Sequence, residues 1–266
     1  MPIVDVGNIE ICYERRGSGP ALLLIGGTGG DLRRPETRFS GPLDRYFEVV
    51  EFDQRGMGRS SKPDIPYCMA DYADDAAGLM AHLGWDSALV VGVSFGGMVA
   101  QELVLRHPGR VRRLVLCCTS SGGAGGASFP YHELPPMSRQ ERAELVLSLS
   151  DVRRDAAWKA ANPAQYRMLH AFAAADPFAD EPGHAAGAAR QLEARAGHDS
   201  WERLAGIACP VLVMGGHHDA IARPENLRAL ASRIPGAELA FFEGGHLFFL
   251  EDKSAYATMT AFLTRL

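Results

Sequence analysis

The segment Gly-Val-Ser-Phe-Gly at residues 92–96 constrains this chain more than any other part of the sequence. Residues 88–91 form an apolar run that predicts a buried strand, and residues 98–105 have the apolar spacing of a helix. A G-x-S-x-G pattern between a strand and a helix is typical of a sharp turn that exposes the serine hydroxyl on a strained backbone. Glycines are needed in such a turn because Cβ atoms there would meet the adjacent strand and helix. We therefore expect Ser94 to be a nucleophile.

Strand-like and helix-like segments alternate up to about residue 120 and again from about residue 207. The expected strands are residues 21–25, 48–53, 88–91, 111–118, 210–214 and 237–242, preceded by an antiparallel hairpin over residues 3–14. Helical patterns over 71–83, 98–105 and 224–233 separate several of them. Strands joined by crossover helices predict an α/β fold with a parallel sheet.

The alternation stops between residues 121 and 206. This stretch begins rich in Gly, Ser and Pro and then reads as consecutive helices without a strand. Three places resemble a capping box, at residues 138–141, 162–165 and 199–202. We expect a helical cap over residues 121–206, inserted into an α/β core formed by residues 1–120 and 207–266.

Composition excludes several classes of protein. The chain has 266 residues, of which 47% are hydrophobic and 22% charged, as in ordinary globular proteins. A net charge of −5 gives no basic footprint for nucleic acid. The start lacks the pattern of a secretory signal, and no apolar run reaches the roughly 20 residues of a membrane helix. Five cysteines without a C-x-x-C pair indicate a reduced, cytoplasmic protein with no disulfide framework and no metal site.

A serine hydroxyl needs a general base to act as a nucleophile at neutral pH. In open parallel sheets, ligands bind at the carboxyl ends of the strands, so the base should follow a strand. Of the nine histidines, only His217, His218 and His246 do so. Two glycines directly before His246 free the backbone to turn there, and we expect His246 to be the base.

The base in turn needs a carboxylate that orients it. Asp219 lies just beyond the strand at 210–214 and is the expected partner. Asp53 also ends a strand, but we assign it the structural task of fixing the loop over residues 54–60. Glu243 is too close to His246 along a tight turn to reach it well.

A serine nucleophile that attacks a carbonyl carbon also needs two N–H donors for the oxyanion that forms. One is expected from Phe95, the residue after the nucleophile, and the other from Thr28 in the glycine-rich loop at residues 26–30. That loop lacks the full patterns of a phosphate cradle.

Over nearly its whole length, the sequence resembles the family of cap-bearing α/β-hydrolases. The stretches that carry the resemblance are residues 52–60, 92–101, 107–116 and 244–251. Within the superfamily the chain is most similar to the branch of 3-oxoadipate enol-lactonases, cofactor-free haloperoxidases and small esterases. The resemblance implies an eight-stranded, mostly parallel sheet flanked by helices and a Ser94, Asp219, His246 triad, with no cofactor.

The sequence departs from many relatives in the oxyanion loop, where Gly26 and Gly27 replace His-Gly. The backbone N–H donor is kept despite this change. The substrate preference near the loop does not carry over from those relatives. Gly27, Phe129 and His132 are our candidate substrate-binding residues.

The leading hypothesis is hydrolysis of an ester or lactone of a small, largely apolar molecule through an acyl-enzyme on Ser94. Two alternatives use the same triad, namely hydrolysis of a carbon–carbon bond and perhydrolysis of the haloperoxidase type. A further alternative from another class is a non-catalytic receptor that retains a hydrolase pocket.

Overall fold

The computed structural model describes residues 1–34 and 39–265. Its centre is an eight-stranded sheet in the order β1-β2-β4-β3-β5-β6-β7-β8. The strands are β1 Ile3–Asp5, β2 Glu10–Arg16, β3 Ala21–Ile25, β4 Glu48–Phe52, β5 Ala88–Val93, β6 Val111–Cys117, β7 Val211–Gly216 and β8 Glu238–Phe242. The pairs β1/β2 and β2/β4 are antiparallel and all other pairs are parallel. The predicted eight-stranded, mostly parallel α/β fold is confirmed.

Helices connect most of the parallel strands. The described α-helices are α1 Met69–His82, α2 Phe95–Arg106, α3 Arg139–Ser150, α4 Ala156–Ala161, α5 Pro163–Ala174, α6 His184–Ala196, α7 Pro224–Arg233, α8 Phe248–Glu251 and α9 Ser254–Leu263. Short 3-10 helices are η2 Gly41–Arg45, η3 Pro108–Arg110, η4 Gly123–Gly125, η5 Tyr131–Glu133 and η6 Trp201–Gly206. Leu266, which the sequence places at the end of the α/β core (residues 1–120 and 207–266), lies outside the described residues.

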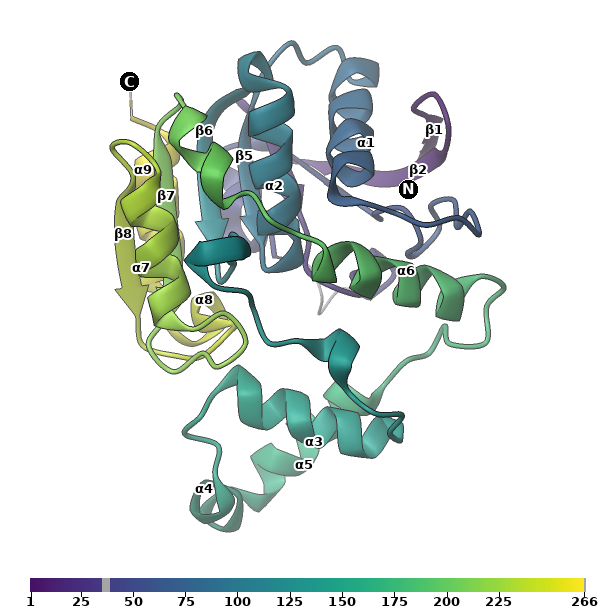
Figure 1. The fold of residues 1–266 in the computed structure, drawn as a ribbon, viewed down its shortest axis with the longest axis vertical. Coiled ribbons are helices and arrows are strands. Elements are labelled where there is room, and N and C mark those ends of the chain that lie inside the picture. The colour runs from purple at the N-terminus through teal and green to yellow at the C-terminus, as the bar shows by residue number, and fades with distance from the viewer. Residues whose placement is uncertain (35–38, 266) are drawn as a thin grey trace.

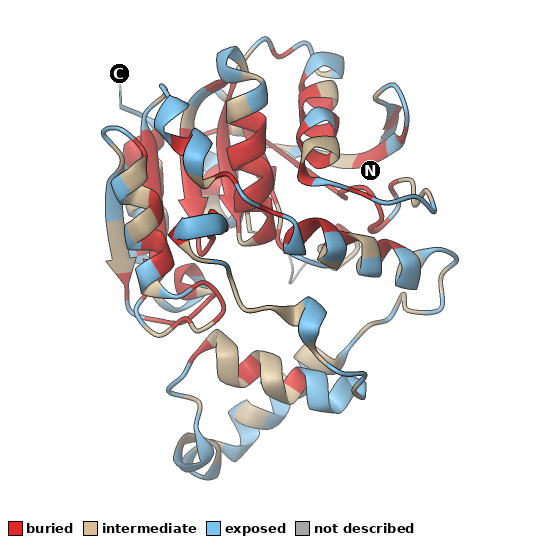
Figure 2. Ribbon diagram, viewed as in Figure 1, coloured by how far each residue is buried: buried red, intermediate tan, exposed pale blue. Residues whose placement is uncertain are grey.

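Helices cover both faces of the sheet, and successive strand residues point to opposite faces. Neighbouring residues of a strand therefore belong to different hydrophobic clusters. In β5, Val90 joins a hydrophobic cluster with α1, α2 and α7 on one face. Its neighbours Leu89 and Val91 join a second cluster with η2, α8 and α9 on the other face. Figure 2 shows this buried centre in the sheet and the helices packed on it. Continuous apolar runs in the central strands therefore follow from a sheet that is covered twice.

Helices α3 to α6 lie between β6 and β7, in a segment that we call the helical insertion (residues 118–210). In Figure 1, α3, α4 and α5 form a group beyond the arrowheads of the central strands, and α6 runs between this group and the sheet. Most residues of α3 to α5 are half-buried or exposed (Figure 2). The carboxyl ends of the strands thus face the helices of the insertion.

Of the three expected capping boxes, one is confirmed and two are wrong. The Ser138 hydroxyl accepts the N–H of Glu141, and the Glu141 carboxylate accepts the N–H of Ser138. The Asn162 side chain instead donates to the carbonyl of Trp158 and so caps the carboxyl end of the preceding helix, α4. The Asp199 carboxylate accepts the Trp201 N–H, but the segment that follows is the 3-10 helix η6.

Asp53 holds the loop after β4, as the sequence indicated. Its carboxylate accepts the N–H of Leu32 at 2.7 Å and that of Arg59 at 2.9 Å. Burial raises the pKa of Asp53 to about 6. This carboxylate therefore organises a loop at the rim of the sheet.

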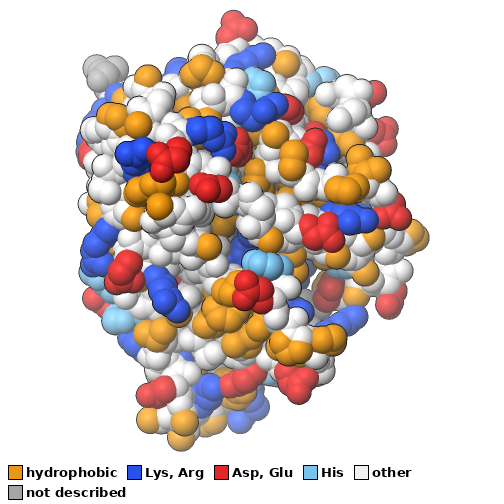
Figure 3. Space-filling model, viewed as in Figure 1, with side chains coloured by type: hydrophobic (Ala, Val, Ile, Leu, Met, Phe, Trp, Pro, Cys, Tyr) orange, Lys and Arg blue, Asp and Glu red, His pale blue; other side chains and the backbone are white. Residues whose placement is uncertain are grey.

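On the face shown in Figure 3, acidic, basic and apolar side chains are interspersed. In the described part of the chain, no helix combines the length and the apolar character that a membrane span requires.

Candidate active site

Ser94 lies at the junction of β5 and α2 with a left-handed backbone, φ 55° and ψ −116°. Its N–H donates to the carbonyl of Cys117 at 2.9 Å, and its carbonyl accepts the Thr119 hydroxyl at 2.8 Å. Few non-glycine residues adopt a positive φ, and they do so where the surroundings impose it. The strained turn expected from the motif is present.

The flanking glycines permit this turn. A Cβ at Gly96 would lie 2.0 Å from the carbonyl oxygen of Ile25 in β3, and one at Gly92 would lie 2.5 Å from the carbonyl oxygen of Gly96. These approaches pack the start of α2 against the end of β3. They also bring the loop after β3 next to Ser94.

Replacing Gly96 by alanine should lower the free energy of unfolding by about 3 kcal/mol, because the methyl group meets fixed backbone atoms. Urea unfolding measures the effect. Gly109→Ala is the matched control, since a Cβ there has no neighbour within 4 Å among the described residues. Equal stability of the two variants would contradict the close packing of β3 and α2.

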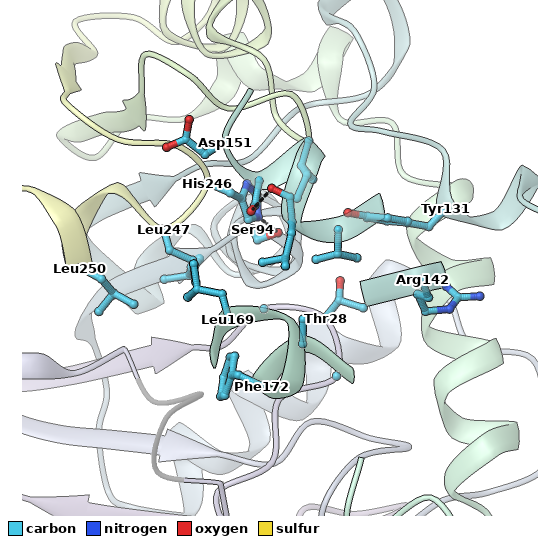
Figure 4. Close-up of a pocket in the computed structure, with 18 of the residues that line it drawn as sticks. Thr28, Ser94, Tyr131, Arg142, Asp151, Leu169, Phe172, His246, Leu247 and Leu250 are labelled. Carbon is cyan, nitrogen blue, oxygen red and sulfur yellow. Dashed lines mark hydrogen bonds between the residues drawn. The ribbon is translucent and has the colours of Figure 1, made fainter. Parts of the chain in front are cut away.

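The structure brings Ser94, His246 and Asp219 together in one hydrogen-bonded series, of which Figure 4 shows Ser94 and His246. The His246 Nε2 atom lies 2.9 Å from the Ser94 Oγ, and Nδ1 lies 2.7 Å from the Asp219 Oδ2. Each residue follows a different strand, β5, β8 or β7. The second oxygen of Asp219 accepts the N–H groups of Ile221 at 2.7 Å and Ala222 at 3.0 Å. The carboxylate is thus fixed from one side and faces the imidazole with the other.

The alternatives weighed from the sequence lie elsewhere. The Glu243 side chain is 72% exposed and lies 3.5 Å from His218. The His217 ring stacks on Phe241. Among the described residues, no cluster of three or more His, Cys, Asp or Glu side chains is arranged to hold a metal ion.

The end of α3 is hydrogen-bonded to the two loops that carry Asp219 and His246. The carbonyl of Leu149 accepts the N–H of Ala220 at 2.9 Å, and the carbonyl of Ser150 accepts the N–H of His246 at 2.6 Å. The N–H of Val152 donates to the carbonyl of His218 at 3.0 Å. The helical insertion therefore helps to position these loops.

The expected oxyanion donors lie beside Ser94. A Cβ at Gly27 would come within 3.6 Å of the Ser94 Cβ, and the loop is held by a bond from the Gly29 N–H to the Gln191 side chain at 2.8 Å. Phe95 is the first residue of α2, so its N–H has no acceptor within the helix. In the described part of the chain, the Thr28 N–H also lacks an acceptor. Both groups are free to bind a developing negative charge.

A cavity of about 1260 Å³ opens over Ser94 and His246. Thr28 and Gly27 line it, together with side chains of the helical insertion and α8. Phe129 and His132, two of the candidate substrate-binding residues, do not line this cavity; they border a separate pocket of about 30 Å³. The Phe129 N–H donates to the carbonyl of Ile221, and the Arg195 side chain in α6 donates to the Phe129 carbonyl, so this segment is tied to α6.

Tyr131 lines the cavity instead, and the sequence analysis did not single it out. In Figure 4 its hydroxyl is directed toward the side of the cavity where Ser94 lies. The Arg195 guanidinium lies 4.9 Å from the centre of its ring, and burial raises the pKa of Tyr131 to about 12. A neutral hydroxyl therefore remains available as a hydrogen-bond donor. In the sequence, Tyr131 lies between Phe129 and His132, the two residues that were selected from this segment.

This chain is similar in sequence to a family model and to characterised proteins, and similar in fold to solved structures. A family model described as "alpha/beta hydrolase fold" matches residues 20–253. The poly(3-hydroxyalkanoate) depolymerase of Ectopseudomonas oleovorans is 30% identical over 89% of this chain and 81% of its own length. The 3-oxoadipate enol-lactonase 2 of Acinetobacter baylyi is 27% identical over 89% of this chain and 85% of its own. The solved enol-lactonase from Burkholderia xenovorans superposes with a TM-score of 0.79, at 27% identity over 99% of this chain and 100% of that one.

Proposed function

The chain belongs to the alpha/beta hydrolase family, and from this premise we propose that it is a serine hydrolase that cleaves a carboxylic ester or lactone. The observation that carries the proposal is the hydrogen-bonded series from Ser94 through His246 to Asp219. Such a series raises the reactivity of the hydroxyl and provides a place for its proton.

In the first half of the proposed reaction, the Ser94 Oγ attacks the carbonyl carbon and His246 Nε2 takes the hydroxyl proton. The carbonyl electron pair moves onto oxygen, where the N–H groups of Thr28 and Phe95 bind it, each contributing about 3 kcal/mol. Asp219 stabilises the imidazolium. Collapse of the intermediate expels the alkoxide, which receives the proton from His246, and leaves an ester on Ser94.

In the second half, a water molecule attacks this ester and gives a proton to His246. Collapse of the second intermediate returns that proton to the Ser94 oxygen and releases the carboxylic acid. In a lactone the leaving alcohol stays attached to the acyl group, so one open-chain hydroxy acid results. We propose that the helical insertion acts as a cap over this site.

The names of the relatives support ester and lactone bonds as substrates. A poly(3-hydroxyalkanoate) depolymerase and a 3-oxoadipate enol-lactonase both match most of this chain at 27–30% identity.

A serine-directed fluorophosphonate tests the proposal. We expect stoichiometric labelling that peptide mass mapping places on Ser94, because only an activated hydroxyl attacks this reagent. Ser94→Ala should take up no label. Labelling at another serine, or none on a folded wild-type protein, would remove the basis for the hydrolase and favour a receptor that keeps the pocket.

A further inference from the structure

The cavity is larger and more apolar than a small lactone requires. Its volume of about 1260 Å³ exceeds the range of about 300–1,000 Å³ that is usual for ligand sites. We propose that the substrate carries an extended aliphatic chain that lies against α5 and α8. This inference rests on the proposed function and names the substrate class of the same site.

The first support comes from α5, an amphipathic helix whose apolar side chains face the cavity. Leu169, Phe172 and Ala173 are spaced three and four residues apart, so they share one face, and all three line the cavity. In α5 no described residue is buried, and Phe172 is 39% exposed. An apolar helix face is ordinarily covered in a folded protein, which makes a bound apolar group the natural occupant here.

The second support comes from the opposite wall. Leu247 and Leu250 line the cavity next to His246, and Leu250 is 57% exposed. In Figure 4 these leucines lie on one side of Ser94, and Tyr131 and Arg142 lie on the other, with Leu169 and Phe172 across the opening. Charged side chains line the leucine wall as well, but there they are paired with one another, Arg153 with Asp151 and both Arg153 and Arg154 with Glu251. The leucines therefore form an apolar strip beside a cluster whose charges are already paired.

Polar contacts to α3 help to fix the position of α5. The Tyr166 hydroxyl donates to the Glu144 carboxylate at 2.5 Å, and the His170 ring contacts the carbonyl of Gln140 at 3.2 Å. Lys159 forms an ion pair with the same Glu144. The contacts of Tyr166 and His170 tie α5 to α3 and that of Lys159 ties α4 to α3, while Leu169 and Phe172 line the cavity and remain available to a ligand.

A chain-length series tests the inference on the intact protein. For p-nitrophenyl esters from acetate to octanoate, kcat/KM should rise by about fourfold per methylene, and by at least about 100-fold overall, because each buried methylene contributes about 0.8 kcal/mol. A parallel series of n-alkyl acetates shows whether the chain lies on the acyl or the alcohol side. Flat or falling kcat/KM in both series would overturn the inference while Ser94-dependent turnover of acetate esters still supports the hydrolase.

A matched pair of variants locates the chain. Ala173→Trp places a large side chain in the cavity, and it should lower the octanoate-to-acetate ratio of kcat/KM by at least about tenfold. Ala171→Trp makes the same change on the same helix at an exposed position that does not line the cavity, and should keep the wild-type ratio. Equal ratios in the two variants would place the chain elsewhere and contradict the proposal.

Binding of product acids separates the inference from catalysis. Trp158 lines the cavity, so its fluorescence reports occupancy, with Trp158→Phe as the control for the signal. Decanoate should bind the wild type at least about 100-fold more tightly than butyrate. If no ester is hydrolysed but this preference is found, the inference stands and the proposed reaction fails. If neither acid shows a preference, the inference fails.

Discussion

Replacing Ser94 by alanine should lower kcat for ester hydrolysis by roughly 10⁶-fold, because the acyl-enzyme can no longer form and only binding and the oxyanion donors remain. Alanine and serine carry the same Cβ, so the left-handed backbone at this position is equally strained in both. The fold should therefore be retained. Initial rates with p-nitrophenyl acetate measure the loss, and circular dichroism confirms the folded state.

Ser232→Ala is the matched control for this variant. Its hydroxyl lies on the exposed part of α7 and donates only to the carbonyl of Ala229. We expect full activity there. If Ser94→Ala retained more than a tenth of the wild-type rate while folded, another group would be the nucleophile.

Replacing Asp219 by asparagine should lower kcat by about 10⁴-fold. The amide oxygen can still accept the N–H groups of Ile221 and Ala222, so the loop should keep its shape. The amide nitrogen then faces His246 Nδ1 and donates to it, which forces the proton onto Nε2. An imidazole in this tautomer cannot accept the Ser94 proton. Steady-state rates of ester hydrolysis at several pH values measure the effect.

Glu243→Gln makes the same carboxylate-to-amide change at the other acid near His246. Because the Glu243 side chain is 72% exposed and contacts His218 rather than His246, we expect kcat within about twofold of wild type. A larger loss for Glu243→Gln than for Asp219→Asn would overturn the assignment of the orienting acid.

The parts that the sequence predicted well depend on local signals. The bounds of β3 and α7 agree with the expected residues 21–25 and 224–233, since an apolar run ends at glycines in the first case and proline occupies the first helical position in the second. Ser94, Asp219 and His246 were selected because each follows a strand, and parallel strands end at one edge of a sheet. The structure places these three side chains within hydrogen-bond distance of one another.

The parts that the sequence did not predict depend on contacts between distant segments. Tyr131 lines the cavity while Phe129 and His132 do not, and the difference is set by Arg195, which bonds to the Phe129 carbonyl and packs on the Tyr131 ring. No local pattern reveals such a contact from α6. Asn162 likewise caps the helix before it, because its amide nitrogen donates to the carbonyl of Trp158 within α4.

The backbone bonds from the end of α3 to the loops after β7 and β8 limit how this enzyme can be recombined with its relatives. A chimera that exchanges everything between β6 and β7 would also replace Leu149, Ser150 and Val152, whose backbones meet the loops of Asp219 and His246. A chimera whose exchanged segment starts after residue 154 would transplant α4 to α6 and keep these native backbone bonds. The cavity wall that α4 to α6 supply is therefore exchangeable, whereas α3 stays with the loops of Asp219 and His246.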